Sequence, residues 1–576
     1  MSRIAVIEKA KCINGKGCEL LCEKVCPVNR QGIECVKTGA NNKAEIVENL
    51  CIGCGICVKK CPTKCIQIIN LPEELNAEPI HRHGVNGFEL FSLPTPMFGK
   101  VVGIVGRNGI GKSTALKIIA GILKPNLGQI GKEASYSDLI DRFKGSEAQS
   151  FFEKLRDGKI KISYKPQEVD SIPKSFNGKV IDLLKKVDEK NQLLEICKEL
   201  EIERILESNI ESISGGELQR VAIAATVLKK ANLYMFDEPT SYLDIKQRIK
   251  VSKFIRKLAD ENTSVLVIEH DLIILDYMTD LVHLMYGRET VYGIVSLPKT
   301  ARVGINTYLS GYLREENMRF RDNEIKFDSK PPIQLKRHVV LTSWDDFEKT
   351  QGSFTLNAVK GKIFKNEVIG VLGENGIGKT TFVKELTYGK IPVKISYKPQ
   401  YLNKSDEPVI LYLKNAIGKY KSQLINPLNI EPLLDKNLDE LSGGEHQRVE
   451  IVKCLSEDAD IFLLDEPSAY LDVEQRLLVS KVIKDFMFML EKAAIIVDHD
   501  LLFIDYFSEK IMVFDGIPAV KGVANEPMSM QDGMNKFLKD LNMTFRRDPE
   551  SNRPRANKPE SQKDREQKAE NKLYYL

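Results

Sequence analysis

Apolar runs of four or five residues recur along the chain, and three of them appear twice in the same order. In each half, one run precedes a glycine-rich loop, one ends in two adjacent carboxylates, and one ends in an acidic residue and a histidine. The runs read VVGIV, LYMF and VLVI in the first half and VIGVL, IFLL and AIIV in the second. Short runs of this kind predict buried strands. The pattern therefore predicts two α/β domains in tandem.

The spacing of the repeat indicates a duplicated domain. The equivalent loop lysines, Lys112 and Lys379, are 267 residues apart, far more than the period of a solenoid. A shorter repeat follows each domain, GINTYLSGYLREENMRFRD at 304–322 and GMNKFLKDLNMTFRRD at 533–548. We expect these hinge segments to lie where the two halves meet. The expected divisions are residues 1–70, 71–300, a first hinge at 301–330, 331–525, and a second hinge with the C-terminal tail at 526–576.

The two halves differ by one insertion. From the loop lysine to the next motif glutamine is 55 residues in the first half and 21 in the second, so the first domain carries about 34 extra residues near 131–163. There SYSDLIDRFKGSEAQSFFEKLRDGK predicts two short amphipathic helices broken at Gly145. Long insertions are often functional, but an inert surface insertion fits equally well. The polar tail from about 549 predicts an extended segment, whose last residues, LYYL, are apolar enough to dock.

Composition excludes some classes of protein without naming a partner. An apolar content of 42% argues against wholesale disorder, and a net charge of +4 neither requires nor excludes nucleic acid. No run approaches the roughly 18 apolar residues of a membrane span. The N-terminal MSRIAVIEKAKC lacks the layout of a secretory signal. We therefore expect a cytoplasmic protein with no membrane partner.

Ten of the 12 cysteines lie at or before Cys65. Without a secretory signal, clustered thiols favour metal over disulfides. LCIGCGICVKKCP has the C-x₂-C-x₂-C-x₃-C-P spacing of [4Fe–4S] ligands, with zinc as the alternative. A second cysteine run with looser spacing, Cys12, Cys18, Cys22 and Cys26, precedes it. In two-cluster ferredoxins the last cysteine of each run ligates the other cluster. One cluster would then take Cys12, Cys18, Cys22 and Cys61, and the other Cys26, Cys51, Cys54 and Cys57. Cys35 and Cys65 are left over and are expected to be small buried hydrophobes.

Each glycine-rich loop lies between a predicted strand and a predicted helix, which is the context of a P-loop. Its backbone N–H groups and the helix N-terminus favour phosphate. We expect Lys112 to reach the β- and γ-phosphates of ATP and Ser113 to supply an oxygen to Mg²⁺. The phosphate-binding residues expected in the first half are Gly106, Asn108, Gly109, Gly111, Lys112, Ser113 and Thr114. Those expected in the second half are Gly373, Asn375, Gly376, Gly378, Lys379, Thr380 and Thr381.

The paired carboxylates complete the predicted chemistry of each half. In Asp237–Glu238 and Asp465–Glu466, the first carboxylate is expected to hold Mg²⁺ and the second to polarise the attacking water. Both pairs follow an SGGE motif by 23 residues and precede a histidine by 33 or 34. The histidines, His270 and His499, are assigned to catalysis together with Glu238 and Glu466.

P-loop, YKPQ glutamine, SGGE signature, carboxylate pair and histidine, in this order, resemble the ATP-binding cassette family. The resemblance implies that the signature of one cassette covers the nucleotide on the P-loop of the other. One composite site would add Gln167 and Asp237 to the first P-loop, covered by Ser442, Gly443, Gly444 and Glu445. The other would add Gln400 and Asp465 to the second P-loop, covered by Ser214, Gly215, Gly216 and Glu217. The residue that stacks on adenine stays open among His83, Phe88 and, in the second half, Phe354.

Two ferredoxin-type cysteine runs ahead of two cassettes resemble the iron–sulfur twin-ATPase ribosome-recycling factors, cassette subfamily E or the RNase L inhibitor family. The insertion and the NMxFR-type hinge segments extend the resemblance over nearly the whole chain. It implies two P-loop cassettes of α/β fold behind a small α+β ferredoxin-like domain with two [4Fe–4S] clusters, and it implies ATP and Mg²⁺ as further ligands.

The same resemblance implies a function. Such ATPases split ribosomes into subunits after termination, when ATP closes the cassettes and hydrolysis resets them. Expected partners of a monomer are the ribosome's small subunit with its rRNA and proteins, a release factor and initiation factors. An ATP-gated electron-transfer protein and a transporter ATPase subunit are the alternatives.

Overall fold

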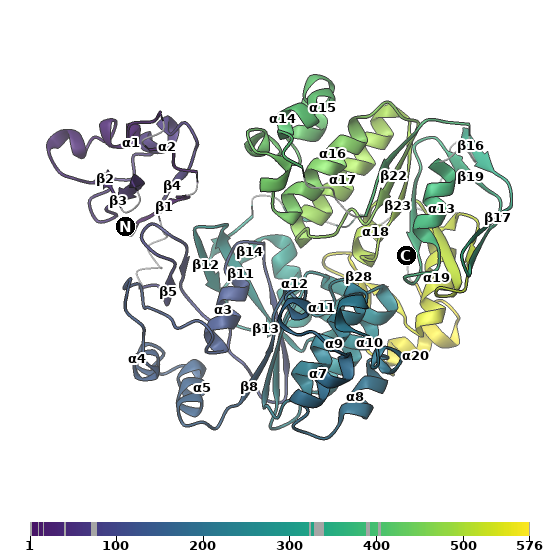
Figure 1. Ribbon diagram of the computed structural model, residues 1–576, viewed down its shortest axis with the longest axis horizontal. Helices are drawn as coiled ribbons and strands as arrows, with labels where there is room; N and C mark the ends of the chain where they lie inside the picture. Colours follow the sequence, from purple (N-terminus) through teal and green to yellow (C-terminus); the bar gives the residue numbers. More distant parts are fainter. Residues whose placement is uncertain are drawn as a thin grey trace.

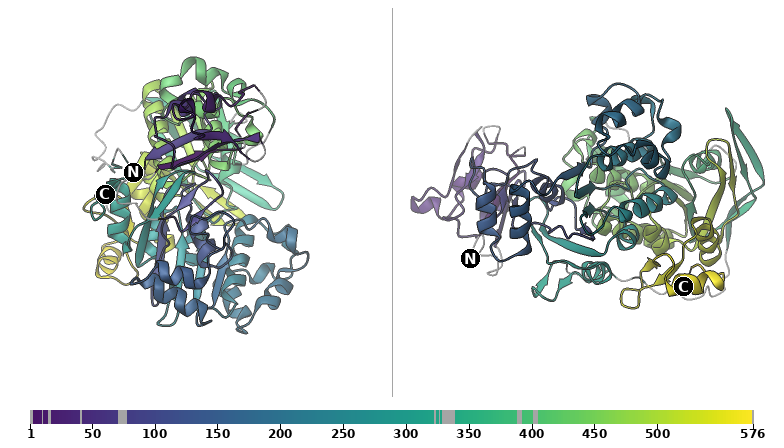
Figure 2. Two further views of the ribbon diagram at one scale, coloured as in Figure 1. Left: turned by 90° about the vertical axis from the view of Figure 1, so that its left-hand side faces the viewer. Right: turned by 90° about the horizontal axis from the view of Figure 1, so that it is seen from below.

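The computed structural model describes residues 3–9, 11–14, 17–39, 42–70, 78–321, 324–325, 327, 339–387, 392–400 and 405–574. Figure 1 shows a small N-terminal module at the left, next to the first α/β domain, with the second domain at the right. Figure 2 shows the same arrangement from two further directions. Within the described part, no helix is long and apolar enough to span a bilayer.

The N-terminal module consists of two antiparallel strand pairs and two short helices. β1 pairs with β4, and β2 with β3. Its interior is a separate core of 15 buried residues, of which seven are cysteines. The bounds are β1 Arg3–Ile7, α1 Leu21–Lys24, β2 Val36–Thr38, β3 Ala44–Ile46, α2 Ile56–Lys60 and β4 Ile66–Asn70.

Asn86 fastens this module to the first domain. Its side-chain oxygen accepts from the backbone N–H of Ile46 at 2.9 Å, and its side-chain nitrogen donates to the carbonyl of Ile46 at 3.0 Å. Arg82 pairs with Glu48 of the module at 2.5 Å. Since Asn86 is buried to 1% exposure, these hydrogen bonds are shielded from water. The module is therefore held to the loop between the first two strands of the first domain.

The first domain is built on a sheet of nine strands in the order β5-β6-β12-β11-β7-β10-β9-β8, with β13 paired to β11. The neighbouring strands β11, β7, β10, β9 and β8 run parallel to one another. Of these, β7, β9 and β10 are buried along their whole length. Such strands read as continuous apolar runs because helices cover both faces. The strands are β5 His81–Arg82, β6 Glu89–Leu90, β7 Val101–Val105, β8 Ile162–Lys165, β9 Leu233–Asp237, β10 Ser264–Ile268, β11 Leu281–Arg288, β12 Tyr292–Val295 and β13 Lys299–Thr300. The helices are α3 Lys112–Ile119, α4 Tyr136–Arg142, α5 Glu147–Arg156, α6 Ile172–Ser175, α7 Val180–Val187, α8 Leu193–Glu199, α9 Gly215–Val227, α10 Ile245–Lys257 and α11 Leu272–Met278.

The second domain repeats this sheet in the order β17-β18-β25-β24-β20-β23-β22-β21, with β26 on β24 and a separate β16–β19 pair. Its strands are β16 Val340–Trp344, β17 Phe347–Gln351, β18 Phe354–Ala358, β19 Gly361–Phe364, β20 Val368–Leu372, β21 Ile395–Lys398, β22 Ile461–Asp465, β23 Ala493–Val497, β24 Lys510–Ile517, β25 Lys521–Ala524 and β26 Met528–Ser529. Its helices are α13 Lys379–Glu385, α14 Val409–Tyr412, α15 Lys414–Lys419, α16 Gly443–Ser456, α17 Val473–Leu490 and α18 Leu501–Phe507. The sheet thus extends past the boundary expected at 525, because β26 still pairs with it.

The insertion in the first domain forms the two expected helices, α4 and α5, on either side of Gly145. Leu139, Phe151 and Phe152 are buried and pack into the core of the first domain. Figure 1 shows the pair on the side that faces away from the second domain. The insertion is therefore a packed part of the domain.

The hinge segments form corresponding structures. The first hinge contains α12 Ala301–Ser310, β14 Tyr312–Leu313 and β15 Met318–Arg319; the second contains α19 Met530–Leu541, β27 Phe545–Arg547, β28 Pro554–Ala556 and α20 Gln562–Ala569. The expectation of an extended tail after 549 is wrong. The tail folds because Arg553, Leu573 and Tyr574 are buried against the rest of the chain, so the predicted docking of the LYYL end is borne out for its first two residues. The last two residues of the tail lie outside the described residues, and so does most of the segment 326–338 after the first hinge strands.

One apolar core runs through both domains and both hinge segments. It includes Val101 and Phe236 of the first domain, Val368 of the second, and Tyr308 and Phe545 of the hinges. The halves therefore pack on a shared interior, with the hinge segments between them as expected from the repeat.

Candidate functional site

Each P-loop curls around its own lysine. Lys112 Nζ donates to the carbonyls of Gly106 at 2.9 Å and Arg107 at 2.7 Å, and Lys379 Nζ donates to those of Gly373 at 2.8 Å and Glu374 at 2.7 Å. The glycine before each lysine begins the helix in the left-handed region, with φ of 89° and 93°. That conformation favours glycine. Thr114 and Thr381 lie in the first turns of the two helices. Each lysine is thus buried inside a loop whose shape suits phosphate.

The other predicted motifs converge on one glutamate in each domain. Gln167 Nε2 donates to Glu238 Oε1 at 2.8 Å, and His270 Nε2 lies 3.2 Å from the same oxygen. In the second domain, Gln400 donates to Glu466 at 2.8 Å and His499 Nε2 lies 3.6 Å away.

The aspartate before each glutamate contacts the P-loop helix. Asp237 is hydrogen-bonded by Ser113, and Asp465 accepts from Thr380 at 2.8 Å. The structure therefore brings together, in each domain, the lysine, hydroxyl, aspartate, glutamate, glutamine and histidine that the sequence singled out.

Both glutamates have a backbone conformation that side chains usually avoid. Glu238 has φ of 47° and Glu466 has φ of 46°, although neither is a glycine. Such strain persists where the surrounding structure fixes it, and it clusters at functional sites. The strain directs both carboxylates toward the glutamine and histidine of their own domain.

The two glutamates differ in electrostatics. Burial alone would raise the pKa of Glu238, but the neighbouring His270, with Lys112 nearby, lowers that pKa to about 2. Burial raises the pKa of Glu466, and the neighbouring Asp498 raises it further. The two sites therefore share a geometry but differ in proton affinity.

Each signature motif begins a helix. Ser214 caps α9 and Ser442 caps α16, each through a capping box with the glutamate three residues later. The glycines between them lie in the first turn: Gly215 and Gly216 in α9, and Gly443 and Gly444 in α16. Helix N-termini of this kind present N–H groups and a favourable dipole to an anion.

The domains meet through aspartates that the sequence motifs did not single out. The backbone N–H of Asn108 donates to Asp472 of the second domain at 3.2 Å, and that of Asn375 donates to Asp244 of the first at 3.1 Å. Each aspartate caps the helix after its own carboxylate pair. The repeated YLD that follows each pair was the available signal. The two P-loops therefore face the opposite domain reciprocally.

The cysteines gather in two groups. Cys12, Cys18, Cys22 and Cys61 line one cavity, together with the leftover Cys65, whose Sγ lies 3.5 Å from that of Cys61. Burial, together with the proximity of Cys51, Cys54 and Cys26, raises the pKa of Cys57 to about 11. The leftover Cys35 adjoins Cys26 and Cys51. The geometry thus groups the last cysteine of each run with the other run, which fits two four-thiolate sites.

Comparisons with known proteins match both parts of the chain. A family described as ABC transporter matches residues 96–241 and 356–469, and one described as 4Fe-4S binding domain matches residues 44–67. The chain is 44% identical over 599 residues to translation initiation factor RLI1 of Saccharomyces cerevisiae, covering 100% of this chain and 98% of the relative.

Two solved structures are also similar. One describes ribosome-bound archaeal Pelota and ABCE1, and a chain of it matches with TM-score 0.92 and 50% identity, covering 100% of this chain and 99% of that one. The archaeal ribosome recycling factor aABCE1, in complex with the archaeal ribosomal stalk protein aP1, matches with TM-score 0.82 and 50% identity, covering 87% and 99%. The chain belongs to the ATP-binding cassette E family.

As a member of this family, the chain is an ATPase with two cassettes, and its N-terminal module is an iron–sulfur domain with two [4Fe–4S] clusters. The α/β fold of the cassettes behind a small ferredoxin-like domain is confirmed. Iron binding requires thiolates, yet burial, with Cys18 nearby, raises the pKa of Cys22 to about 12. Loading the module with iron therefore releases protons.

Two of the residues considered for stacking on adenine occupy matching positions in the two cassettes. The ring of Phe88 packs against Gly111 of the first P-loop, and the ring of Phe354 packs against Gly378 of the second. His83 is exposed, and its ring centroid lies 6.1 Å from that of Phe88. Phe88 and Phe354 are therefore the equivalent pair, while His83 lies on the same loop as Asn86, which holds the iron–sulfur domain.

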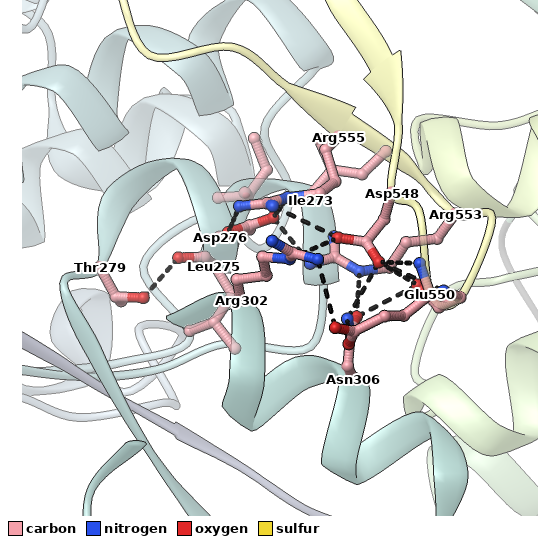
Figure 3. A network of polar contacts seen from close by, with 12 residues as sticks. Ile273, Leu275, Asp276, Thr279, Arg302, Asn306, Asp548, Glu550, Arg553 and Arg555 are labelled. Atoms are coloured by element: carbon pink, nitrogen blue, oxygen red, sulfur yellow. Dashed lines mark hydrogen bonds and ion pairs between the residues drawn. The ribbon is translucent and has the colours of Figure 1, made fainter. Parts of the chain in front are cut away.

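The hinges connect the cassettes by charged groups (Figure 3). Arg302 and Asn306 of α12 contact Asp548 at 3.1 and 2.9 Å. Asp548 is fully buried, and hydrogen bonds from Asn306 and from the backbone of its own turn, with the charge of Arg553, lower its pKa to about 2 despite burial. Hinge 1 therefore binds hinge 2 through a carboxylate that stays ionised.

Proposed function

We propose that this chain is an ATP-driven ribosome recycling factor that splits ribosomes into subunits and stays on the small subunit into initiation. The observation that carries the proposal is the match along the full chain, at TM-score 0.92, to a chain from the structure of ribosome-bound archaeal Pelota and ABCE1. The names of two other relatives, a recycling factor and a translation initiation factor, support the same role.

The residues assemble into two composite ATP sites under this proposal. The first comprises the P-loop of the first cassette with Gln167, Asp237, Glu238 and His270, covered by the signature Ser442–Glu445. The second comprises the P-loop of the second cassette with Gln400, Asp465, Glu466 and His499, covered by Ser214–Glu217. The hydrogen bonds from Asn108 to Asp472 and from Asn375 to Asp244 support this reciprocal arrangement.

Each group has a defined task in hydrolysis. The loop amides and Lys112 bind the phosphates, which requires Lys112 to exchange its bonds to the carbonyls of its own loop for phosphate oxygens. Ser113 and Asp237 would hold Mg²⁺, which neutralises charge on the β- and γ-phosphates. Glu238, oriented by Gln167 and His270, accepts a hydrogen bond from the attacking water. The corresponding residues of the second cassette act in the same way.

Closure of the cassettes is the step that would act on the ribosome. ATP held between the halves draws each signature toward the opposite P-loop, and hydrolysis removes this bridge. The iron–sulfur domain is fastened through Asn86 and Arg82 to the first cassette, so that motion is passed to it. When bound, the clusters supply a metal–thiolate interior that stiffens this domain.

The proposed partners are the small subunit with its rRNA and proteins, a release factor and initiation factors, and the proposed location is the cytoplasm. The experiment is cosedimentation of the purified monomer with small subunits and whole ribosomes in a non-hydrolysable ATP analogue. We expect analogue-dependent association with small subunits. The matched control, Lys112→Ala with Lys379→Ala, should stay in the supernatant.

Absence of association with either particle would overturn the proposal. A second arm separates it from electron transfer, because the rate of ATP hydrolysis is expected to be the same with oxidised and reduced clusters. A rate that follows the redox state would favour the electron-transfer alternative.

A further inference from the structure

Glu474 of α17 lies at the contact between the second cassette and the first P-loop. Arg107, within that loop, donates from Nε to Glu474 Oε2 at 2.6 Å, and its Nη2 lies 2.5 Å from the same oxygen. The carbonyl of Arg107 accepts from Lys112 Nζ at 2.7 Å. A carboxylate of the second cassette therefore binds the side chain of Arg107, whose carbonyl accepts a hydrogen bond from the P-loop lysine.

The other oxygen of Glu474 accepts from Arg321 of the first hinge. Arg321 also donates to the carbonyls of Tyr308 and Leu309, at the end of α12, and its guanidinium lies 4.9 Å from the centre of the Tyr308 ring. Its side chain is only 8% exposed. Arg321 is thus fixed by the hinge, and Glu474 joins two arginines from two different elements.

Among the residues that the structure describes, the corresponding contact at the second P-loop has the charges reversed and shows no connection to a hinge arginine like that of Glu474. Glu374 of the loop pairs with Lys246 of the first cassette at 2.7 Å, and the two side chains are more open to solvent, at 34% exposure for Glu374 and 40% for Lys246. In the second hinge, Arg547 pairs instead with Asp505 at 2.7 Å. One charged group of that hinge that lies near Lys246 and Glu374 is an acid, Asp540.

We propose that Glu474 is a positioning residue for hydrolysis at the first composite site, where it couples the P-loop, through Arg107, to the first hinge, through Arg321. The inference rests on the proposed composite sites and names a coupling that the second site does not share. A largely buried carboxylate between two guanidiniums holds a defined geometry because each pair is charge-assisted. Displacing it moves the loop on which Lys112 depends, and small displacements of binding groups are costly in rate.

The test is a charge exchange at each site. Turnover of the first site is measured in a Glu466→Gln background, and turnover of the second in a Glu238→Gln background. The exchange Lys246→Glu with Glu374→Lys re-forms an isolated pair, so second-site kcat should recover above that of Glu374→Lys alone. The exchange Arg107→Glu with Glu474→Arg places an arginine against Arg321, so first-site kcat should fall about 10-fold.

Adding Arg321→Met to the first-site exchange should recover about threefold, since it removes the new repulsion. The conservative variant Glu474→Gln should also lower first-site kcat with little change in KM, and it should lower total turnover in the otherwise unmodified chain. Lys481→Met, at an exposed position on the same helix, is the matched control and should leave turnover unchanged.

The inference would be overturned if both charge exchanges restored the kcat of their own site to the same extent. Wild-type turnover of Glu474→Gln would also overturn it. Should a Glu474 variant fail to fold, Arg107→Met and Arg321→Met still decide the matter, because each must lower first-site and spare second-site turnover. Failure of the composite-site proposal looks different: Glu238→Gln and Glu466→Gln would then hydrolyse ATP at the wild-type rate, while the effect of Glu474→Gln on total turnover would still be readable.

Discussion

Arg553, the residue just before β28, donates to Asp276 of α11 at 2.8 Å, although 277 residues separate them in sequence. Arg555 donates to the same carboxylate at 2.6 and 2.9 Å (Figure 3). Asp276 is 5% exposed and Arg553 is fully buried. The start of β28 is therefore fixed to the first cassette by one shared carboxylate.

Asp276→Asn should destabilise the chain strongly. It leaves two arginines against a neutral amide, and breaking a buried ion pair costs about 3–5 kcal/mol. We expect a clear fall in the urea midpoint of unfolding. Glu550→Gln is the matched control, because Glu550 is 67% exposed where it meets Arg302 and exposed pairs contribute at most about 1 kcal/mol. Equal shifts for both variants would contradict the role of burial.

Replacement of Glu238 and Glu466 by glutamine should separate ATP binding from hydrolysis. Glutamine keeps the shape of glutamate but is a far weaker acceptor for the proton of the attacking water. We expect the double variant to lose turnover by at least about 10²-fold, as is usual for a general base, while nucleotide stays bound. Phosphate release and retention of labelled nucleotide measure the two effects. Unchanged turnover in the double variant would rule out both carboxylates as bases.

Asp271 predicts a pH-dependent stability. Burial raises its pKa to about 7, with Asp500 adding repulsion that Arg248 does not cancel. A carboxyl whose pKa is higher in the folded than in the unfolded chain, where it is about 3.9, binds its proton more tightly when folded. Its stabilising contribution is therefore complete below about pH 4 and is lost as the pH rises through about 7.

Asp271→Asn should flatten that dependence, because the amide stays neutral and can still accept from the N–H groups of Ile273 and Ile274. The measurement is the thermal unfolding midpoint between about pH 5 and pH 8, where wild type should lose more than the variant. Asp141→Asn, at an exposed position in the insertion, should follow wild type. A variant as pH-dependent as wild type would refute the assignment.

The crossed grouping of the cysteines predicts iron contents. Cys22→Ser and Cys61→Ser should each lower iron from about eight to about four atoms per chain, and the double variant should lose no more than either single. Cys22→Ser with Cys57→Ser should lose all iron, since these thiols belong to different clusters. Cys197→Ser, buried in the first cassette, should keep full iron content. Complete loss in the Cys22–Cys61 pair would disprove the crossing.

Local sequence predicts the part of the site that lies within one cassette. The P-loop, the carboxylate pair and the histidine each adjoin a buried strand, and parallel strands bring their ends to one edge of the sheet. The convergence of Gln167 and His270 on Glu238 follows from that arrangement. The insertion helices were predictable for the same reason, because their amphipathic pattern is local.

Contacts between the two halves could not be predicted from local sequence. Arg107 and Glu474 are 367 residues apart, and neither stands out in its own segment. The polarity of the tail suggested a solvated segment, whereas Arg553 and Arg555 are used in buried ion pairs. Only the tertiary structure shows that Asp276 lies opposite them.

The cysteine-rich interior of the N-terminal module has a consequence for how the molecule is made. Seven of the 15 residues in that core are cysteines, so little aliphatic material remains to hold it together without metal. The cassettes and hinges share a separate and far larger interior. A freshly made chain can therefore pack its cassettes and hinges before any iron arrives, whereas the module completes its interior only when iron is delivered.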